Sequence, residues 1–316
     1  DGGSGVGVRV GGWVVFWREA GAMSEGAGPR HITISGELGS GKSSVATELS
    51  DILGFPVVST GSLQREIASS MRMTTLEANL HAESDWSIDE RIDGMTVRLA
   101  READSGIVFD SRMAWHFVPG ALNVRLTVDP YVAARRVVER GAGAAEHYGS
   151  VDEAFDAILD RSASEGRRFA AIYGVDLGRL ANFDLVIDTS ILPVEQVARL
   201  IAQSHAVPAG PRQVLVSPRT VVPAFRSDAA SPAGVEVVHV RPFYFAVAGR
   251  DALAQAIADG VDLVPVEVIG DGKLPWGGTA SSMVGLAVED PAVRQWEQDH
   301  NLSLTGLRRY HQARRG

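Results

Sequence analysis

The feature that most constrains this chain is the glycine-rich segment at residues 36–43, GELGSGKS, which lies between an apolar stretch and a helical pattern. Ile32 and Ile34 alternate with polar residues before it, as they would in a strand. A strand, a glycine turn and a helix in this order are the setting in which a phosphate-binding loop works, so we predict nucleotide-phosphate binding. The apolar residues at helical spacing after the segment are Val45, Ala46, Leu49, Ile52 and Leu53.

Each part of this segment has a role in holding a polyphosphate. Glycines let backbone amides turn toward phosphate oxygens, and the helix start adds partial positive charge. Lys42 would reach the β- and γ-phosphates, and the hydroxyl of Ser43 would ligate Mg²⁺. A chance glycine turn is the alternative, but Lys42 and Lys273 are the only two lysines, which makes such a match rare. The predicted donor-binding residues are Gly36, Gly39, Ser40, Gly41, Lys42, Ser43 and Ser44.

Composition excludes several classes of function. The net charge of −9 and a pI of about 5.4 argue against a general nucleic-acid binder. The absence of cysteine excludes disulfides, thiol catalysis and cysteine-ligated zinc. No apolar run reaches the length of a membrane span, so no membrane partner is expected. If the loop uses ATP, the cytoplasm is the expected location.

Strand and helix patterns alternate from residue 30 to residue 205. This alternation predicts an α/β fold, in which a parallel sheet is covered by helices on both faces. The active site should then lie at the carboxyl ends of the strands. Strands are expected at 56–60, 106–110, 121–128 and 184–188, and helices at 62–71, 75–100, 131–140, 151–173 and 193–204.

The chain divides by composition into four parts. Residues 1–29 are glycine-rich, and we expect a flexible leader; a secretory signal is the weaker alternative, because Arg18 and Glu19 interrupt its apolar patch. Residues 30–205 form the phosphate-loop domain, and 206–211 (AVPAGP) form a linker. Residues 212–316 should form a small α+β domain, with strands at 214–216, 235–240, 243–247 and 263–269, one helix at 251–259 and a basic, solvated tail at 308–315.

Arginines downstream of the loop point to phosphoryl transfer. Phosphoryl transfer between two nucleotides needs positively charged side chains beside the donor phosphates, the acceptor phosphate and the phosphoryl group that is transferred. A solvated surface charge is the alternative for any single arginine, but the positions at strand ends and on two helices favour a function. Asp110 ends a predicted strand, and it either contacts magnesium or ties down a loop. The arginines are Arg65, Arg112, Arg136, Arg140, Arg161 and Arg168.

Five segments in order, ITISGELGSGKSSVA, STGSLQREIA, FDSRMAW, RSASEGRRFAAIYGVD and FDLVIDTS, resemble the cytidylate kinases, most closely their short archaeal form. The resemblance covers about residues 30 to 204. It implies the nucleoside monophosphate kinase fold with a mobile lid at about 141–168 and a hinged acceptor segment at about 62–95. It also implies transfer from ATP, with Mg²⁺, to CMP or dCMP.

The resemblance assigns roles residue by residue. Residues 36–43 match the loop that binds the donor phosphates. The resemblance matches Thr60, Gly61, Arg65 and Arg112 to acceptor binding, and Arg161 and Arg168 to the lid. From their positions we add Asp110 and Arg140 to the acceptor side, and the expected catalytic set is Lys42, Arg112, Arg161 and Arg168. Arg136 falls where the family has an arginine near the adenine. Ser111 departs from the glycine common after the acidic residue, and its side chain could crowd the acceptor pocket. Asp89 and Asp93 could accept a hydrogen bond from the cytosine amino group, or form a solvated helix face.

The C-terminal part resembles the ParB/sulfiredoxin-type segment in FYFAVAGRDALAQAIADGVDLVPVEVI. The turn at residues 249–252 (GRDA) lacks the second basic residue of that family, so the default role is regulation, oligomerisation or partner binding. Two alternatives to a nucleoside monophosphate kinase stay open: a kinase for a different small-molecule acceptor, and a non-catalytic ATP-binding regulatory protein.

Overall fold

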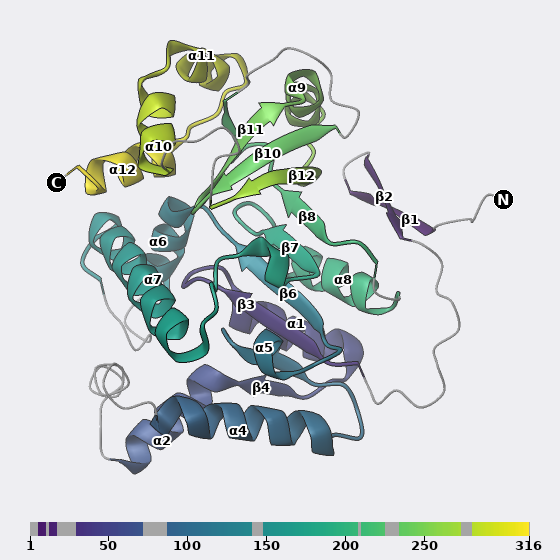
Figure 1. Cartoon of the computed structure of the whole chain (residues 1–316). Helices are drawn as coiled ribbons and strands as arrows, with labels where there is room; N and C mark the ends of the chain where they lie inside the picture. The colour runs from purple at the N-terminus through teal and green to yellow at the C-terminus, as the bar shows by residue number, and fades with distance from the viewer. Residues whose placement is uncertain are drawn as a thin grey trace.

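The fold is built on one mixed sheet in a computed structural model that describes residues 6–10, 13–17, 30–71, 87–140, 148–207, 210–224, 234–272 and 280–315 (Figure 1). In spatial order its ten strands within these residues are β4 (Val57–Ser59), β5 (Val108–Asp110), β3 (Ile32–Gly36), β6 (Leu122–Thr127), β7 (Leu185–Asp188), β8 (Gln213–Val216), β12 (Val264–Asp271), β10 (Val235–Val240), β11 (Phe243–Ala248) and β9 (Val222–Pro223).

The strands from β4 to β8 all run parallel, which confirms the predicted α/β fold. β3 lies between β5 and β6, with Ile34 opposite Asp110 on one side and Val124 on the other. Beyond β8 the direction changes: β12 pairs antiparallel with β8 and parallel with β10, and β11 pairs antiparallel with β10.

Helices cover both faces of the parallel part. α1 (Lys42–Leu53) and α8 (Val194–His205) pack together on one face, where Leu49 and Ile201 are completely buried with the strand residues Ile34 and Val124. On the other face Phe109 packs against α5 (Ala114–Phe117). The remaining elements here are α2 (Thr60–Ser70), α4 (Ser87–Glu102), α6 (Pro130–Glu139), α7 (Val151–Tyr173) and the 3₁₀ turn η2 (Leu180–Asn182).

The carboxyl ends of the parallel strands meet along one edge of the sheet. β3 ends at Gly36, β5 at Asp110 and β6 at Thr127. The glycine-rich loop leaves from this edge, as the strand pattern predicts for an α/β site.

The C-terminal part continues the same sheet. β8, which we expected in a separate domain, is instead the next parallel strand after β7, with Val186 opposite Val214. The segment 206–211 therefore precedes a strand shared by both parts, and the division into two folding units stays a prediction. The helices of this part are α9 (Arg250–Ala258), α10 (Ala280–Glu289), α11 (Pro291–Asp299) and α12 (Thr305–Ala313).

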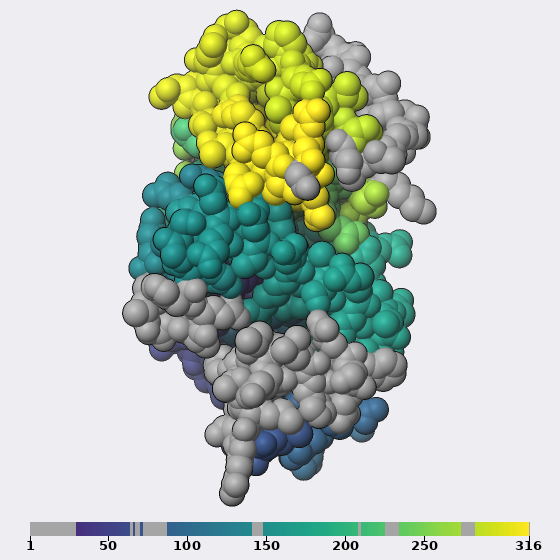
Figure 2. All heavy atoms as spheres, turned by 90° about the vertical axis from the view of Figure 1, so that its left-hand side faces the viewer, coloured from purple at the N-terminus to yellow at the C-terminus, as the bar shows by residue number. Residues whose placement is uncertain are grey.

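Both terminal segments contain regular structure. The leader contains an antiparallel hairpin, β1 (Val6–Val10) and β2 (Trp13–Trp17), because β-branched and aromatic residues favour strands. The tail is only partly solvated: Arg309 donates to Asp152 and Asp156 of α7 at 2.7 and 2.8 Å, whereas Arg314 and Arg315 are exposed. Figure 2 shows these C-terminal helices packed against α6 and α7.

Among the helices described, none combines the length and apolar character that crossing a membrane requires.

Candidate active site

The glycine-rich loop is held in one shape by its own hydrogen bonds. Gly39 and Gly41 have φ of 81° and 86°, in the left-handed region that glycine tolerates. A Cβ atom at Gly39 would lie 2.8 Å from Ala133 of α6, so a larger residue does not fit there. The hydroxyl of Ser40 donates to the carbonyl of Glu37 at 2.8 Å, and the Ser40 carbonyl accepts from Thr189 at 3.0 Å.

Lys42 opens α1 and turns back over the loop. Its Nζ atom donates to the carbonyls of Gly36 at 2.7 Å and Glu37 at 3.0 Å. Burial, together with the nearby guanidinium of Arg112, lowers the pKa of Lys42 to about 8. The ammonium group therefore lies where donor phosphates would bind, among groups that make it easier to deprotonate than a free lysine.

This shifted pKa predicts how triphosphate binding depends on pH. Lys42 is charged below its pKa, so we expect affinity for a nucleoside triphosphate to be highest below pH 8 and to fall as pH rises through about 8. The fall should approach about tenfold per pH unit if binding requires the ammonium. A titration of a non-hydrolysable analogue from pH 6.5 to about 9.5 measures it. Lys42→Arg should flatten the curve, because a guanidinium stays charged in this range; a flat curve in the parent protein would contradict the assignment.

Ser43 and Asp110 form a pair suited to magnesium. The Ser43 hydroxyl donates to Oδ2 of Asp110 at 2.7 Å, across the junction of α1 and β5. The described residues contain no cluster of three acidic or histidine side chains that could hold a metal alone. A hydroxyl and a carboxylate fit Mg²⁺ in a site completed by phosphate oxygens and water. Ser59 and Thr60 also contact Asp110, at 3.5 and 3.4 Å, so Asp110 joins the loop to the start of α2.

A pocket of about 380 Å³ opens beside the loop on the side of α6. Arg136 crosses it and donates to the carbonyls of Thr189 at 2.7 Å and Ser190 at 3.2 Å. Ser40, Gly41 and Ser44 line the same pocket, which places it next to the donor phosphates. Arg140 lines this same pocket with Arg136, and its predicted role on the acceptor side stays a prediction.

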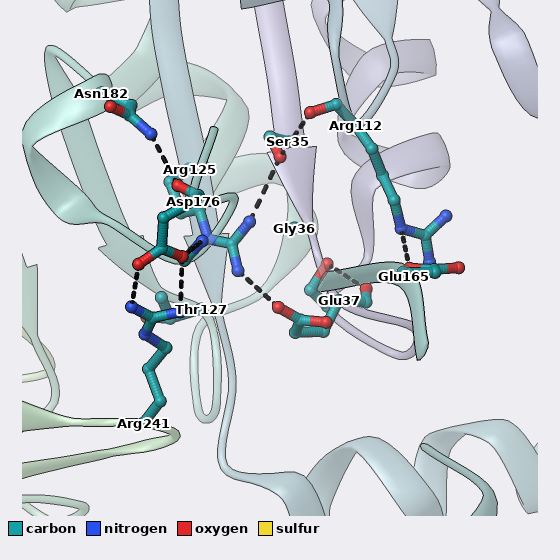
Figure 3. A network of polar contacts seen from close by, with 12 residues as sticks. Ser35, Gly36, Glu37, Arg112, Arg125, Thr127, Glu165, Asp176, Asn182 and Arg241 are labelled. Carbon is teal, nitrogen blue, oxygen red and sulfur yellow. Dashed lines mark hydrogen bonds and ion pairs between the residues drawn. The ribbon is translucent and has the colours of Figure 1, made fainter. Parts of the chain in front are cut away.

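On the opposite side of the loop, two of the predicted arginines converge on one carboxylate. Arg112 lies just beyond β5 and pairs with Glu165 at 2.5 Å through its Nε atom. Arg161, one turn earlier on α7, pairs with the other oxygen of Glu165 at 2.9 Å. Figure 3 shows the Arg112–Glu165 pair beside the loop residues Gly36 and Glu37. Ser111 does not crowd the site, because its side chain is buried and accepts from backbone amides at the start of α5.

A second polar group joins α4 to α7. Arg168 lies 3.9 Å from Asp89, and Tyr173 donates to Asp93 at 2.6 Å. Burial raises the pKa of Asp93 to about 6, although the Tyr173 hydrogen bond acts in the opposite direction. Among the described residues, neither Oδ2 of Asp89 nor Nε of Arg168 has a hydrogen-bond partner, and both atoms are buried. The acidic pair is therefore not a solvated helix face.

Some predicted residues are only partly placed. Thr60 and Gly61 begin α2 directly after β4, next to Asp110. The side chain of Arg65, most of the expected acceptor segment (72–86) and the start of the expected lid (141–147) lie outside the described residues.

Other functional side chains were not singled out from the sequence. Glu37 pairs with the buried Arg125, and Tyr173 donates to Asp93 of α4. Glu165 belongs to the Arg161–Arg168 pattern that resembles the family, but its pairing with Arg112 was not predicted. An arginine inside the apolar strand ALNVRLTV was a usable signal for Arg125, because a charged group in a buried strand needs a partner. Glu165 stands four residues after Arg161 and three before Arg168, which places all three near one helix face.

Comparison with known proteins finds matches to the part of the chain that contains this site. Residues 31–191 match the model of the cytidylate kinase-like family. A cytidylate kinase of Pyrobaculum arsenaticum is 37% identical over 171 residues, which cover 54% of this chain and 89% of that protein. A cytidylate kinase of Sulfolobus acidocaldarius is 39% identical over 171 residues, covering 54% and 91%. A cytidylate kinase of Ignicoccus hospitalis is 37% identical over 172 residues, covering 54% and 95%.

Proposed function

This chain belongs to the cytidylate kinase-like family, and we propose that it transfers a phosphoryl group from ATP to a nucleoside monophosphate, with CMP or dCMP favoured. The single observation that best supports transfer is the convergence of Arg112 and Arg161 on Glu165, next to Lys42 and the loop. A protein that only sensed ATP would need no such positive charge on the acceptor side.

The loop and its neighbours position the donor. Backbone amides of residues 36–43 and the start of α1 would hold the phosphates, while Arg136 lines the pocket beside them. Ser43 and Asp110 would hold Mg²⁺, which supplies charge neutralisation when bound. Lys42 would exchange its two carbonyl contacts for phosphate oxygens.

The acceptor needs alignment rather than activation. Its phosphate oxygen is already an anion, so no strong general base is required, and the site contributes orientation and electrostatic stabilisation. Arg112 and Arg161 would leave Glu165 to contact phosphate oxygens, and Glu165 would return them to their resting positions after release. Closure of α7 over the site would exclude water, which otherwise hydrolyses the donor.

The unpaired atoms between α4 and α7 fit a cytosine edge. Cytosine presents an amino donor beside ring acceptors, and Oδ2 of Asp89 with Nε of Arg168 supply an acceptor beside a donor. We therefore place the base of the acceptor between these helices, with Asp93 and Tyr173 holding the second turn of α4 in position.

Asp89→Asn is expected to change the preference for the acceptor base. An amide can rotate to donate to the oxygen that uracil carries in place of the amino group, so the ratio of kcat/KM for CMP over UMP should fall by about ten- to a hundredfold. Steady-state kinetics with both acceptors measures this ratio. Glu90→Gln, a similar change at the next residue of α4, which is exposed, should leave it unchanged. An unaltered ratio in Asp89→Asn would remove Asp89 from base recognition.

A coupled ADP-release assay against a panel of nucleoside monophosphates tests the function as a whole. Turnover of CMP or dCMP above the other acceptors is the expected result. Turnover of an unrelated acceptor alone would favour a different small-molecule kinase, and ATP binding without transfer would favour a regulatory protein. Because ATP is the proposed donor, we also expect the protein to work in the cytoplasm.

A further inference from the structure

A cavity that the proposed reaction does not use lies between the family domain and the C-terminal part. Its volume is about 560 Å³, which is within the range of small-molecule sites. One wall comes from α6 and α7, and the other from the β10–β11 turn and α12. The C-terminal walls lie beyond residues 31–191, the part that matches the family model, so this cavity belongs to the extended chain.

Part of the cavity lining is a single apolar cluster. Val128, Ala133, Ile158 and Leu159 form its surface, and the ring of Tyr310 closes it from α12. Phe243 packs edge-on against Tyr310 with ring centroids 5.4 Å apart, which fixes the orientation of that ring. This part of the lining suits a planar apolar group.

The rest of the lining carries an excess of positive charge, part of it beside Tyr310, because the Arg314 guanidinium lies 5.4 Å from the centre of that ring. Four arginines line the cavity against two carboxylates, Glu37 and Asp176; the arginines are Arg125, Arg167, Arg241 and Arg314. Arg241 is paired with Asp176, and Arg125 with Glu37, as Figure 3 shows. Within the described residues, the buried Nε of Arg125 has no hydrogen-bond partner, although the Arg125 side chain is only 7% exposed. A buried donor without a partner is costly. An anion in the cavity would reach this Nε atom only after a shift of the Arg125 side chain, because the atom is buried.

We propose that this cavity is a second ligand site, which binds a small organic anion with a flat apolar body. The anionic group would lie against Arg125 and between Arg167 and Arg314, and the apolar body would lie under Tyr310. Nucleoside phosphates and aromatic carboxylates share this chemistry.

Glu37 connects the second site to the phosphate loop. Burial disfavours its charge, but Arg125, Arg112 and Lys42 together hold the pKa of Glu37 below its usual value. Its carboxylate is thus a negative charge beside the donor phosphates, neutralised chiefly by Arg125. An anion that shares Arg125 would weaken this neutralisation and lower the affinity for the donor. By linkage, the donor would lower affinity for the anion by the same factor.

The test uses the full chain and the fluorescent probe 8-anilinonaphthalene-1-sulfonate, a flat apolar molecule with one anionic group. Saturable binding is expected. Ala163→Trp fills the cavity from α7 and should weaken binding by about tenfold or more, whereas Ala163→Ser should not. Equal affinity in the parent and the tryptophan variant would overturn the proposal.

Two neighbouring arginines just after α12 locate the anionic group, even if the tryptophan variant fails to fold. Arg314 lines the cavity and Arg315 does not, yet both are exposed and adjacent. Arg314→Glu should weaken probe binding by about fivefold or more, and Arg315→Glu should leave it unchanged. Equal effects of the two changes would contradict a site at this place.

Two further measurements define the ligand and the coupling. Displacement of the probe by CMP and CTP, but not by an aromatic carboxylate, would identify the natural ligand as a nucleotide. Displacement by the aromatic carboxylate alone would identify a non-nucleotide ligand. Displacement by neither class would contradict the proposed ligand chemistry. Saturating probe should raise the Kd of a non-hydrolysable ATP analogue by about fivefold in the parent and not in Glu37→Gln. This readout needs no turnover, so it distinguishes failure of the second site from failure of the proposed reaction.

Discussion

Replacing Lys42 with alanine is expected to reduce phosphoryl transfer by about a thousandfold or more, because the variant loses an ammonium group aimed at the transferring phosphates. Lys42 lies half-buried over the loop, where its two carbonyl contacts hold it in place without phosphate. Alanine leaves no charge in this position, and water cannot replace it in a closed site. The coupled ADP-release assay with CMP measures the loss in kcat.

The effect must be separated from damage to the loop. Lys42→Arg keeps the charge at a different reach and should retain more activity than Lys42→Ala. Thermal melting should be little changed in Lys42→Ala, since loss of the side chain also removes the cost of burying its charge. Retention of more than about a tenth of the parent kcat in Lys42→Ala would show that the phosphates lie elsewhere.

The parallel half of the fold could be predicted from local patterns. The loop at residues 36–43 follows a five-residue strand and precedes α1, as its glycines and the helical spacing required. The positions of Asp110 and Arg112 at the end of a strand then predicted that they lie near the loop, because the carboxyl ends of parallel strands meet at one edge of the sheet. The family comparisons cover this same half.

The remainder depended on contacts between distant segments. β8 follows a proline- and glycine-containing stretch typical of a linker, so its pairing with β7 could not be predicted from composition. The basic tail looked solvated because Arg309 has its partners, Asp152 and Asp156, more than 150 residues earlier in the chain. The proposed oligomeric or partner-binding role of the C-terminal part stays a prediction.

Acidic partners of the arginines explain how a site rich in positive charge is stable before substrate binds. Unpaired guanidiniums in a half-buried cleft would repel one another and would lower the charge on Lys42 further. Glu165 holds Arg112 and Arg161 together, and Glu37 holds Arg125. Each carboxylate occupies a position that a substrate phosphate can take over. The arginine–carboxylate pairs seen without substrate therefore predict which arginines can bind substrate.

Arg112 provides the sharpest test of that idea. Arg112→Ala is expected to lower kcat/KM for CMP by about a hundredfold, mostly through a higher KM, because a charge-assisted contact to the acceptor phosphate is lost. Its side chain is 23% exposed and close enough to Lys42 to lower the pKa of that residue. Arg112→Ala should therefore also move the fall in triphosphate affinity to higher pH, while affinity at pH 7 changes little.

Two comparisons separate this role from a general loss of positive charge. Arg135→Ala removes an exposed arginine of α6 that pairs only weakly with Glu139, at 3.4 Å, and should leave kinetics unchanged. Arg112→Lys keeps the charge without the planar fork and should fall between the parent and the alanine variant. If Arg112→Ala binds CMP as tightly as the parent, Arg112 pairs with Glu165 for structural reasons alone, and the acceptor phosphate must lie nearer to Arg161.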